Sequence, residues 1–451
     1  MCSLDHYEQA LAIAREIGDR GSEGPWLGSL GNRYADLGQT SRAIEHYEQA
    51  LAIAREIGDR RNEGVWLGNL GNRYADLGQT SRAIEHYEQA LAIAREIGDR
   101  RSEGPWLGAL GSRYADLGQT SRAIEHYEQA LAIAREIGDR GSEGSWLGSL
   151  GNRYADLGQT SRAIEHYEQA LAIAREIGDR GNEGPWLGVL GNCYADLGQT
   201  SRAIEHYEQA LAIAREIGDR GNEGVWLGNL GDCYADLGQT SRAIEHYEQA
   251  LAIAREIGNR FLESAWLINL GESQSNEERY EQAMLSCEQA MHIADEIGNV
   301  QSRNVSRYIM ARTALYRNDL IAARTRGEEA HGYDYPPNNP HVAVLLGVIA
   351  LRQNDRIAAK QAFQEALTHV DKRLSLTSQD YQALDSKGLT LAGLALYGES
   401  ARLAEAIEAY LAARAINHDA GYLKQILHLF DALAAVDKDG MLTAVRKAAA
   451  G

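Results

Sequence analysis

One segment, repeated almost without change, constrains the fold of this chain more than any other feature. Residues 34–60 read YADLGQTSRAIEHYEQALAIAREIGDR, and the segment returns every 40 residues up to residue 260. The only difference among the copies is Asn259, which replaces an aspartate in the last one. A fixed period of about 20–50 residues indicates stacked helical or strand units that bury their cores against their neighbours. The chain is therefore expected to be a repeat array and not a set of globular domains.

The second half of each unit has the clearest helical pattern. Its apolar residues fall on one stripe at helical spacing. In the first copy these residues are Ala43, Tyr47, Ala50, Leu51, Ala54 and Ile57. Gly38 predicts a break before this helix, and Gly58 predicts its end. Thr40 or Ser41 can supply the N-terminal cap.

The first half of each unit predicts a second helix, antiparallel to the first. Its apolar stripe consists of Leu27, Leu30, Gly31 and Tyr34. Ser22 or Asn62 as the N-cap would place Pro25 in the first turn, where proline is tolerated. We expect a longer helix in the repeats that carry Val65 and a late or bent start in those that carry Pro25.

These large and small residues occupy the signature positions of the tetratricopeptide repeat (TPR) family. The matching residues are Leu30, Gly31, Tyr34, Gly38, Ala43, Tyr47 and Ala50. The chain therefore resembles this family, and the resemblance implies an all-α fold, a right-handed αα-superhelix of antiparallel helix pairs. It also implies that the first helix starts at Asp19 or Asp59.

Two narrower resemblances concern the length of the unit and the tail. The 40-residue unit is similar to the repeats of LGN/Pins-type adaptors and of sensor arms in bacterial signalling ATPases. The segments 343–367 and 441–451 resemble the end of such STAND-type (NB-ARC-like) ATPases. These resemblances imply a bacterial sensor domain.

The decay of the repeat divides the chain into four predicted segments. They are an orphan second helix or N-terminal cap at 1–20, six near-identical TPR units at 21–260, two degenerate units at 261–335, and diverged units with C-terminal capping helices at 336–451. The stretch 331–340, HGYDYPPNNP, predicts a loop. A helical pair is expected at 378–415, and helices at 419–434 and 439–449 are expected to close the array.

Differences among the six copies are confined to 21–33 and its equivalents. On a helix the variable positions fall within one arc of about 120°, which predicts a stripe that points away from the partner helix. The TPR resemblance implies that this direction is the concave groove where a protein or peptide binds. The alternative is a solvent-exposed face that drifts, although exposed positions of the second helix are identical in all copies.

Asparagine dominates one variable site, and its amide can donate to and accept from the backbone of an extended peptide. Gly28 and its copies are expected to keep the groove wall low. The predicted ligand-binding residues are Asn32, Asn72, Ser112, Asn152, Asn192 and Asp232, with Asp36, Asp76, Asp116, Asp156 and Asp196, Asn69 and Asn229, and Arg73, Arg113 and Arg153. TPR adaptors hold peptide backbone with such asparagines. The lysines of carboxylate-clamp TPRs are absent from this groove.

Charge argues against two classes of partner, and the cysteines indicate the redox state of the protein. The net charge is −19 and the basic residues are spread through the repeats, which argues against nucleic acid and anionic membrane as partners. No apolar run is long enough to span a bilayer. Cys193 and Cys233 occupy the same site in adjacent repeats, too far apart for an undistorted disulfide. Reduced thiols in a cytoplasmic protein are therefore expected.

The sequence predicts no catalytic centre, cofactor or metal site. It lacks GxxxxGK[ST], HExxH and GxSxG. The ladder of His46 and its copies cannot converge on one ion, and packing between repeats explains the tryptophans more simply than ligand stacking does. We therefore expect a ligand-sensing arm that binds an extended peptide or protein segment. The alternative is a structural module that forms homo-oligomers through repeat stacking.

Overall fold

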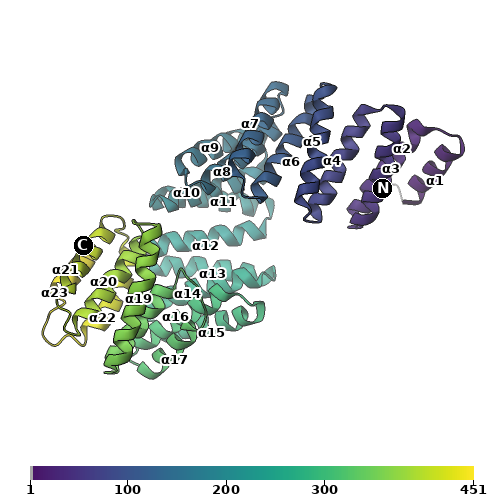
Figure 1. Cartoon of the computed structure of the whole chain (residues 1–451). Coiled ribbons are helices and arrows are strands. Elements are labelled where there is room, and N and C mark those ends of the chain that lie inside the picture. Colours follow the sequence, from purple (N-terminus) through teal and green to yellow (C-terminus); the bar gives the residue numbers. More distant parts are fainter. Residues whose placement is uncertain (1–3) are drawn as a thin grey trace. The chain divides into compact units, whose positions relative to one another are not determined.

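The computed structural model describes residues 4–451, and this part of the chain contains 23 helices and no strand (Figure 1). Successive helices pair antiparallel, so the predicted all-α TPR solenoid is confirmed. The chain separates into two compact units, Met1–Trp186 and Leu187–Gly451. We call these the N-terminal unit and the C-terminal unit. The division falls inside helix α10 and not at residue 260, where the repeat begins to decay.

The repeat region begins with α1 (Leu4–Glu16) and continues as alternating first and second helices. The first helices are α2 (Arg20–Asp36), α4 (Arg60–Asp76), α6 (Arg100–Asp116), α8 (Arg140–Asp156), α10 (Arg180–Asp196), α12 (Arg220–Asp236), α14 (Arg260–Asn276) and α16 (Val300–Tyr316). The second helices are α3 (Thr40–Ile57), α5 (Thr80–Glu96), α7 (Thr120–Ile137), α9 (Thr160–Ile177), α11 (Thr200–Ile217), α13 (Thr240–Glu256), α15 (Tyr280–Ile297) and α17 (Leu320–His331). The remainder comprises α18 (Asn339–Arg352), α19 (Arg356–Leu376), α20 (Tyr381–Ala395), α21 (Arg402–Arg414), α22 (Ala420–Ala434) and α23 (Thr443–Ala450).

The first helices begin at the same position whether or not they contain proline. In α2 the Asp19 carboxylate accepts a hydrogen bond from the Ser22 N–H at 3.1 Å, which makes Asp19 the N-cap. The late start expected for the Pro25 repeats is therefore wrong, and so is Ser22 as the cap. The aspartate cap and the ion pairs of Glu23 fix the first turn. Pro25 removes only the donor that would reach back to Gly21.

The second helices from α3 to α15 start without a side-chain cap, so the predicted cap at Thr40 or Ser41 is wrong. Thr40 is already the first helical residue, and Gln39 occupies the cap position. Gly38, at φ +70°, turns the chain directly from one helix into the next, and the Gln39 N–H bonds the carbonyl of Tyr34 at 2.8 Å. Gly58, at φ +74°, ends α3 as predicted.

Two glycines of each unit make room for aromatic rings. A Cβ on Gly31 would lie 2.6 Å from the Tyr47 ring of the partner helix, and a Cβ on Gly28 would overlap the Trp66 ring of the next repeat. The expectation that Gly28 keeps a ligand groove open is therefore wrong, because its neighbour's tryptophan fills the space. The prediction that the tryptophans serve inter-repeat packing is confirmed: Trp66 also stacks on Tyr47 at 6.1 Å between ring centroids.

Several smaller expectations can be compared with the described residues. The loop after His331 and the helix pair α20 and α21 lie where predicted. His46 stacks on Tyr34 with ring centroids 5.1 Å apart. Three of the cysteines, Cys193, Cys233 and Cys287, are free and buried, as expected, whereas Cys2 lies outside the described residues. None of the helices in 4–451 combines the length and apolarity needed to cross a bilayer.

In the C-terminal unit the first helices lie on the inside of a curve. Neighbouring ones pack on each other, α12 on α14, α14 on α16, α16 on α18 and α18 on α20. The closely packed pairs within 4–451 include no two consecutive second helices. Because the first helices are the closer row, they form the concave side.

Helix α22 lies where the sequence predicts one of two closing helices, but its contacts are not confined to the end of the array. It folds back to contact α12, α16, α18 and α20. Its N-terminal residue Gly421 lies against the Ala235 carbonyl at the end of α12. Further along, Lys424 donates to the Asn276 carbonyl at 2.9 Å, and His428 stacks on Tyr316 at 3.6 Å. The last helix, α23, packs on α21 and closes that end.

Candidate functional site

The predicted ligand-binding asparagines of the N-terminal unit are held by tyrosines of the partner helices. Tyr47 donates its hydroxyl to Asn32 Oδ1 at 2.6 Å, and the equivalent bonds reach Asn72 at 2.6 Å and Asn152 at 2.7 Å. The stripe therefore does not point wholly away from the partner helix, as expected from the sequence. Each bond occupies the carbonyl oxygen of the amide, so the amide nitrogen remains as the group that can donate to a ligand.

The remaining polar residues of this row are also fixed by neighbours. Ser112 Oγ lies 2.9 Å from the hydroxyl of Tyr127. Arginine and aspartate three residues apart form ion pairs of 2.9–3.2 Å. These pairs are Arg33–Asp36, Arg73–Asp76, Arg113–Asp116 and Arg153–Asp156. Because each pair is neutral overall, the row offers amide donors without a net charge. Asn69 is half-buried on α4.

In the C-terminal unit the predicted residues form a ladder between repeats. Asn192 Oδ1 accepts from Tyr207 at 2.7 Å and from Asn229 of the next repeat at 3.1 Å. Asp232 accepts in the same way from Tyr247 at 2.6 Å and from Asn269 at 2.9 Å. Asn269 was not among the sequence-predicted residues, although it stands one period after Asn229. The oxygens of Asn192 and Asp232 therefore already have two side-chain donors each.

Cys193 and Cys233 change the electrostatics of the row. They stand where the earlier repeats have arginine, and both are buried. Asp196 and Asp236 consequently lack the arginine three residues before them. Burial raises the pKa of Asp196. Burial, with the nearby carboxylates of Asp419, Asp232 and Glu272, raises the pKa of Asp236 to about 7.

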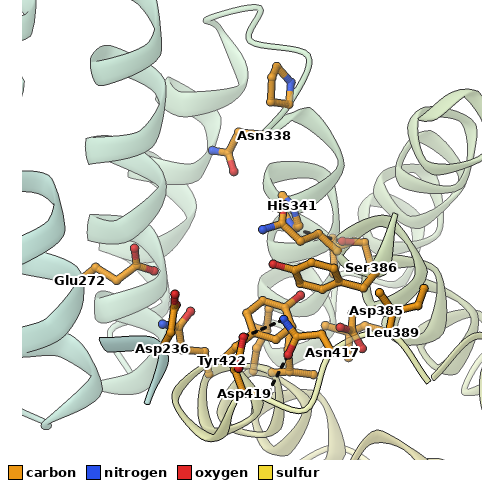
Figure 2. Close-up of a pocket in the computed structure, with 18 of the residues that line it drawn as sticks. Asp236, Glu272, Asn338, His341, Asp385, Ser386, Leu389, Asn417, Asp419 and Tyr422 are labelled. Atoms are coloured by element: carbon orange, nitrogen blue, oxygen red, sulfur yellow. Dashed lines mark hydrogen bonds between the residues drawn. The ribbon is translucent and has the colours of Figure 1, made fainter. Parts of the chain in front are cut away.

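Asp196 and Asp236 open onto a cavity of about 1120 Å³ within the C-terminal unit (Figure 2). Its walls come from the inner helices α12, α14, α16, α18 and α20, with residues of α10 and α21, and α22 covers it. Five carboxylates line the cavity: Asp196, Asp236, Glu272, Asp385 and Asp419. Arg312 is the only lysine or arginine in the lining. The cavity is therefore strongly acidic.

The wall opposite Asp236 and Glu272 contains a dense group of polar side chains (Figure 2). His341 Nδ1 lies 3.1 Å from Ser386 Oγ, and burial lowers the pKa of His341 to about 4, so this imidazole is neutral near pH 7. Asp385 is paired with Arg414 through one oxygen. Beside Asp236, in the segment that leads into α22, the Asn417 amide donates to Asp419 at 3.1 Å.

Sequence reasoning found Asp196 but missed the cavity. Its walls come from residues up to about 230 positions apart, and only the return of α22 closes them. One signal was present in the sequence: arginine occupies this position in the first four repeats, and cysteine replaces it at 193 and 233. No group of three His, Cys, Asp or Glu side chains in residues 4–451 is placed to hold a metal ion.

Comparisons with known proteins bear on the family and the fold. The tetratricopeptide repeat model matches residues 3–56, 30–96, 104–176 and 182–256, which together cover more than half of the chain. No curated protein matches the sequence.

Similar solved structures include a Signal Transduction ATPase with Numerous Domains (STAND) protein with a tetratricopeptide repeat sensor from Pyrococcus horikoshii. Its TM-score is 0.56 at 17% identity, over 77% of this chain and 54% of that chain. Aspartyl phosphate phosphatase F from Bacillus subtilis has a TM-score of 0.50 at 14% identity, over 74% of this chain and 94% of that one. BtubC (BKLC) from P. vanneervenii has a TM-score of 0.44 at 22% identity, over 48% and 91%. At these identities the likeness concerns the fold alone.

Proposed function

Because this chain belongs to the tetratricopeptide repeat family, we propose that its scaffold holds an extended peptide or protein segment along the first helices of the N-terminal unit. Such repeats are generally protein-interaction scaffolds and not enzymes. The observation that carries the proposal is the fixed asparagine row. Tyr47, Tyr87 and Tyr167 each hold an amide by its oxygen and leave its nitrogen to donate.

The spacing of the row suits an extended chain. Packed helix axes lie about 8–10 Å apart, and an extended chain in the polyproline II conformation rises about 3.1 Å per residue with three residues per turn. One amide per repeat can therefore meet every third carbonyl on the same side of a bound peptide. An amide already fixed by a tyrosine loses little side-chain entropy on binding, which favours affinity. The Arg–Asp pairs beside the row have no net charge, so they should not select strongly for the charge of the peptide's side chains.

Its biological context is proposed as the ligand-sensing arm of a bacterial STAND-type ATPase. Two observations support this: the 40-residue unit resembles such arms, and the STAND protein with a TPR sensor matches 77% of this chain in fold. In that setting the bound segment would be the signal, and the repeats would transmit its presence to an ATPase. Light scattering tests the rival role, because a self-assembly module would remain oligomeric on dilution.

The decisive test uses two triple variants of the full chain and a peptide selected against the parent protein from a random displayed library. Changing Asn32, Asn72 and Asn152 to Asp keeps the acceptor for each tyrosine, as Asp232 does for Tyr247, but removes the amide donors. Each lost hydrogen bond is worth about 0.5–1.5 kcal/mol, so affinity should fall about 10- to 1,000-fold. The melting temperature should change little.

Changing the same three residues to Ala should weaken binding similarly and also lower the melting temperature, because three tyrosine hydroxyls lose their acceptors. The matched control changes the exposed Glu85, Glu125 and Glu165 of the second helices to Ala. Exposed charges contribute little, so the control should bind within about threefold of the parent. If the aspartate variant binds as tightly as the parent, the asparagine row is not the site.

A further inference from the structure

We propose that the acidic cavity of the C-terminal unit is a second site, which binds a guanidinium or ammonium cation between the carboxylates of Asp236 and Asp419 and the buried polar groups of α20 and α21. This site is separate from the asparagine row and does not depend on it.

The charges in the cavity are not balanced by the protein. The Arg312 guanidinium is bonded to Glu272 at 2.8 Å, and Asp385 is paired with Arg414. Asp196, Asp236 and Asp419 remain, contributed by α10, α12 and the segment before α22. Burial raises the pKa of Asp236, and repulsion by the nearby carboxylates, that of Asp419 first, raises it further. A bound cation would remove that repulsion.

A second observation comes from the opposite wall. Tyr410 and Asp385 both line the cavity and are 0% and 1% exposed. Within the described residues, the Tyr410 hydroxyl has no hydrogen-bond partner, whereas Asp385 interacts with the Tyr422 hydroxyl and is paired with Arg414. Buried polar groups are almost always hydrogen-bonded, so the unpaired Tyr410 hydroxyl in this cavity wall indicates a missing partner. A tyrosine hydroxyl can accept a hydrogen bond, and a guanidinium offers five N–H donors.

The size of the cavity decides between a metal ion and an organic cation. Its volume of about 1120 Å³ is that of a site for an organic ligand. Asp236 and Glu272 lie on one side of the cavity and Asp385 on the other (Figure 2), and the carboxylates within 4–451 do not converge in the manner of metal ligands. An arginine side chain, free or within a peptide, has the required charge, donors and length.

Binding should depend on pH with a defined sign. The charged groups that act on Asp236 are Asp419 before α22, Asp232 on its own helix and Glu272 on α14. The titratable side chains of Cys233 on α12, Tyr247 on α13 and Tyr381 on α20 also interact with it, and Asp196 and Arg312 line the same cavity. Because Asp236 has a raised pKa of about 7, it is partly protonated at pH 6 and ionised at pH 8. A cation should therefore bind more tightly at pH 8 than at pH 6.

The test titrates the full chain with N-acetyl-arginine amide and with N-acetyl-citrulline amide, which has the same shape but no charge. Calorimetry or NMR should show binding of the arginine probe, at least about tenfold weaker binding of the citrulline probe, and tighter arginine binding at pH 8. Equal binding of the two probes, or no arginine binding at millimolar concentration, overturns the proposal. Two further probes identify the source of the cation. Tighter binding of agmatine indicates a free cation, and tighter binding of a Gly-Gly-Arg-Gly-Gly peptide indicates an arginine within a peptide.

Two variants locate the site. Asp236→Asn should weaken binding of the arginine probe at least about tenfold. Tyr410→Phe keeps the ring but removes the unpaired hydroxyl, so it should weaken binding about three- to tenfold without lowering the melting temperature. The control is Glu281→Gln on α15, where the side chain is 87% exposed, and its affinity should match the parent's. Parent-like affinity in both Asp236→Asn and Tyr410→Phe would overturn the assignment.

Discussion

At the scale of single residues, adjacent repeats are joined by a contact in which a tryptophan ring packs directly on a glycine. Gly28 on α2 receives Trp66 from the next repeat, and the same contact recurs along the array as far as Gly228 and Trp266. Each of these glycines is buried at an interface and is not at the end of a helix. Glycine is unfavourable within a helix by about 1 kcal/mol relative to alanine. Its repeated use here is explained by the space that the ring needs.

Two glycines of α8 give a matched test of this contact. A Cβ on Gly148 would overlap the Trp186 ring, whereas on Gly141 it would meet only Asp139 Oδ1 at 3.7 Å. Gly148→Ala should destabilise the N-terminal unit by about 1–3 kcal/mol through overpacking. Gly141→Ala should stabilise it by up to about 1 kcal/mol through helix propensity. Urea unfolding measures both, and equal stability of the two variants would contradict the packing role of Gly148.

At the scale of elements, α22 differs from all other helices in how it packs. It carries an apolar face with Leu429, Phe430 and Leu433 buried. It reaches α12 through Gly421 and so covers the cavity between the inner helices. A helix of this kind acts as a wall of the acidic site, and its position decides whether the site is enclosed.

Gly421→Ala tests the docking of α22 on α12. The added Cβ would overlap the Ala235 carbonyl oxygen and would lie 3.0 Å from the Gly238 nitrogen, both backbone atoms that cannot move aside cheaply. Hydrogen exchange in 420–434 should become at least about tenfold faster, while that of α13 and α15 stays unchanged. The exposed Lys438→Ala, in the connection after α22, is the control. Unchanged protection of α22 in the glycine variant would show that this contact does not hold it.

At the scale of the whole molecule, stability is distributed along the chain in local contributions. In a repeat array each unit contacts its neighbours, so the total is close to a sum of unit and interface terms. The two compact units, Met1–Trp186 and Leu187–Gly451, each have their own buried core. Damage to one unit should therefore stay local.

Gly111→Leu tests this additivity. A Cβ at this position would lie 2.9 Å from the Tyr127 ring, and the leucine is larger still. We expect a loss of a few kcal/mol in the N-terminal unit and a melting curve that splits into two transitions. Hydrogen exchange should rise around α6 and α7 and stay unchanged beyond residue 187. A single transition at the parent's temperature, or a uniform rise through both units, would contradict local stability.

Periodicity alone predicted most of the fold. The 40-residue repeat, the apolar stripes and the glycines after each helix gave the helix pairs, the ends of the second helices and the packing role of the tryptophans. The start at Asp59 expected for the Val65 repeats is confirmed. The late start expected for the Pro25 repeats is wrong, because the hydrogen bond from Ser22 to Asp19 outweighs the cost of Pro25 inside the helix. The bond from Tyr47 to Asn32 could not be predicted in this way, because it depends on the neighbouring helix.

The sequence by itself determined the parts of this protein that depend on local, repeated contacts: the helical units, their pairing and the row of asparagines. Only the tertiary structure decided the acidic cavity. Asp236, Glu272, Asp385 and Asp419 meet there because the diverged repeats curve and α22 returns to α12. Such contacts join residues far apart in the chain. No period or local spacing encodes them, since they depend on the accumulated geometry of every repeat in between.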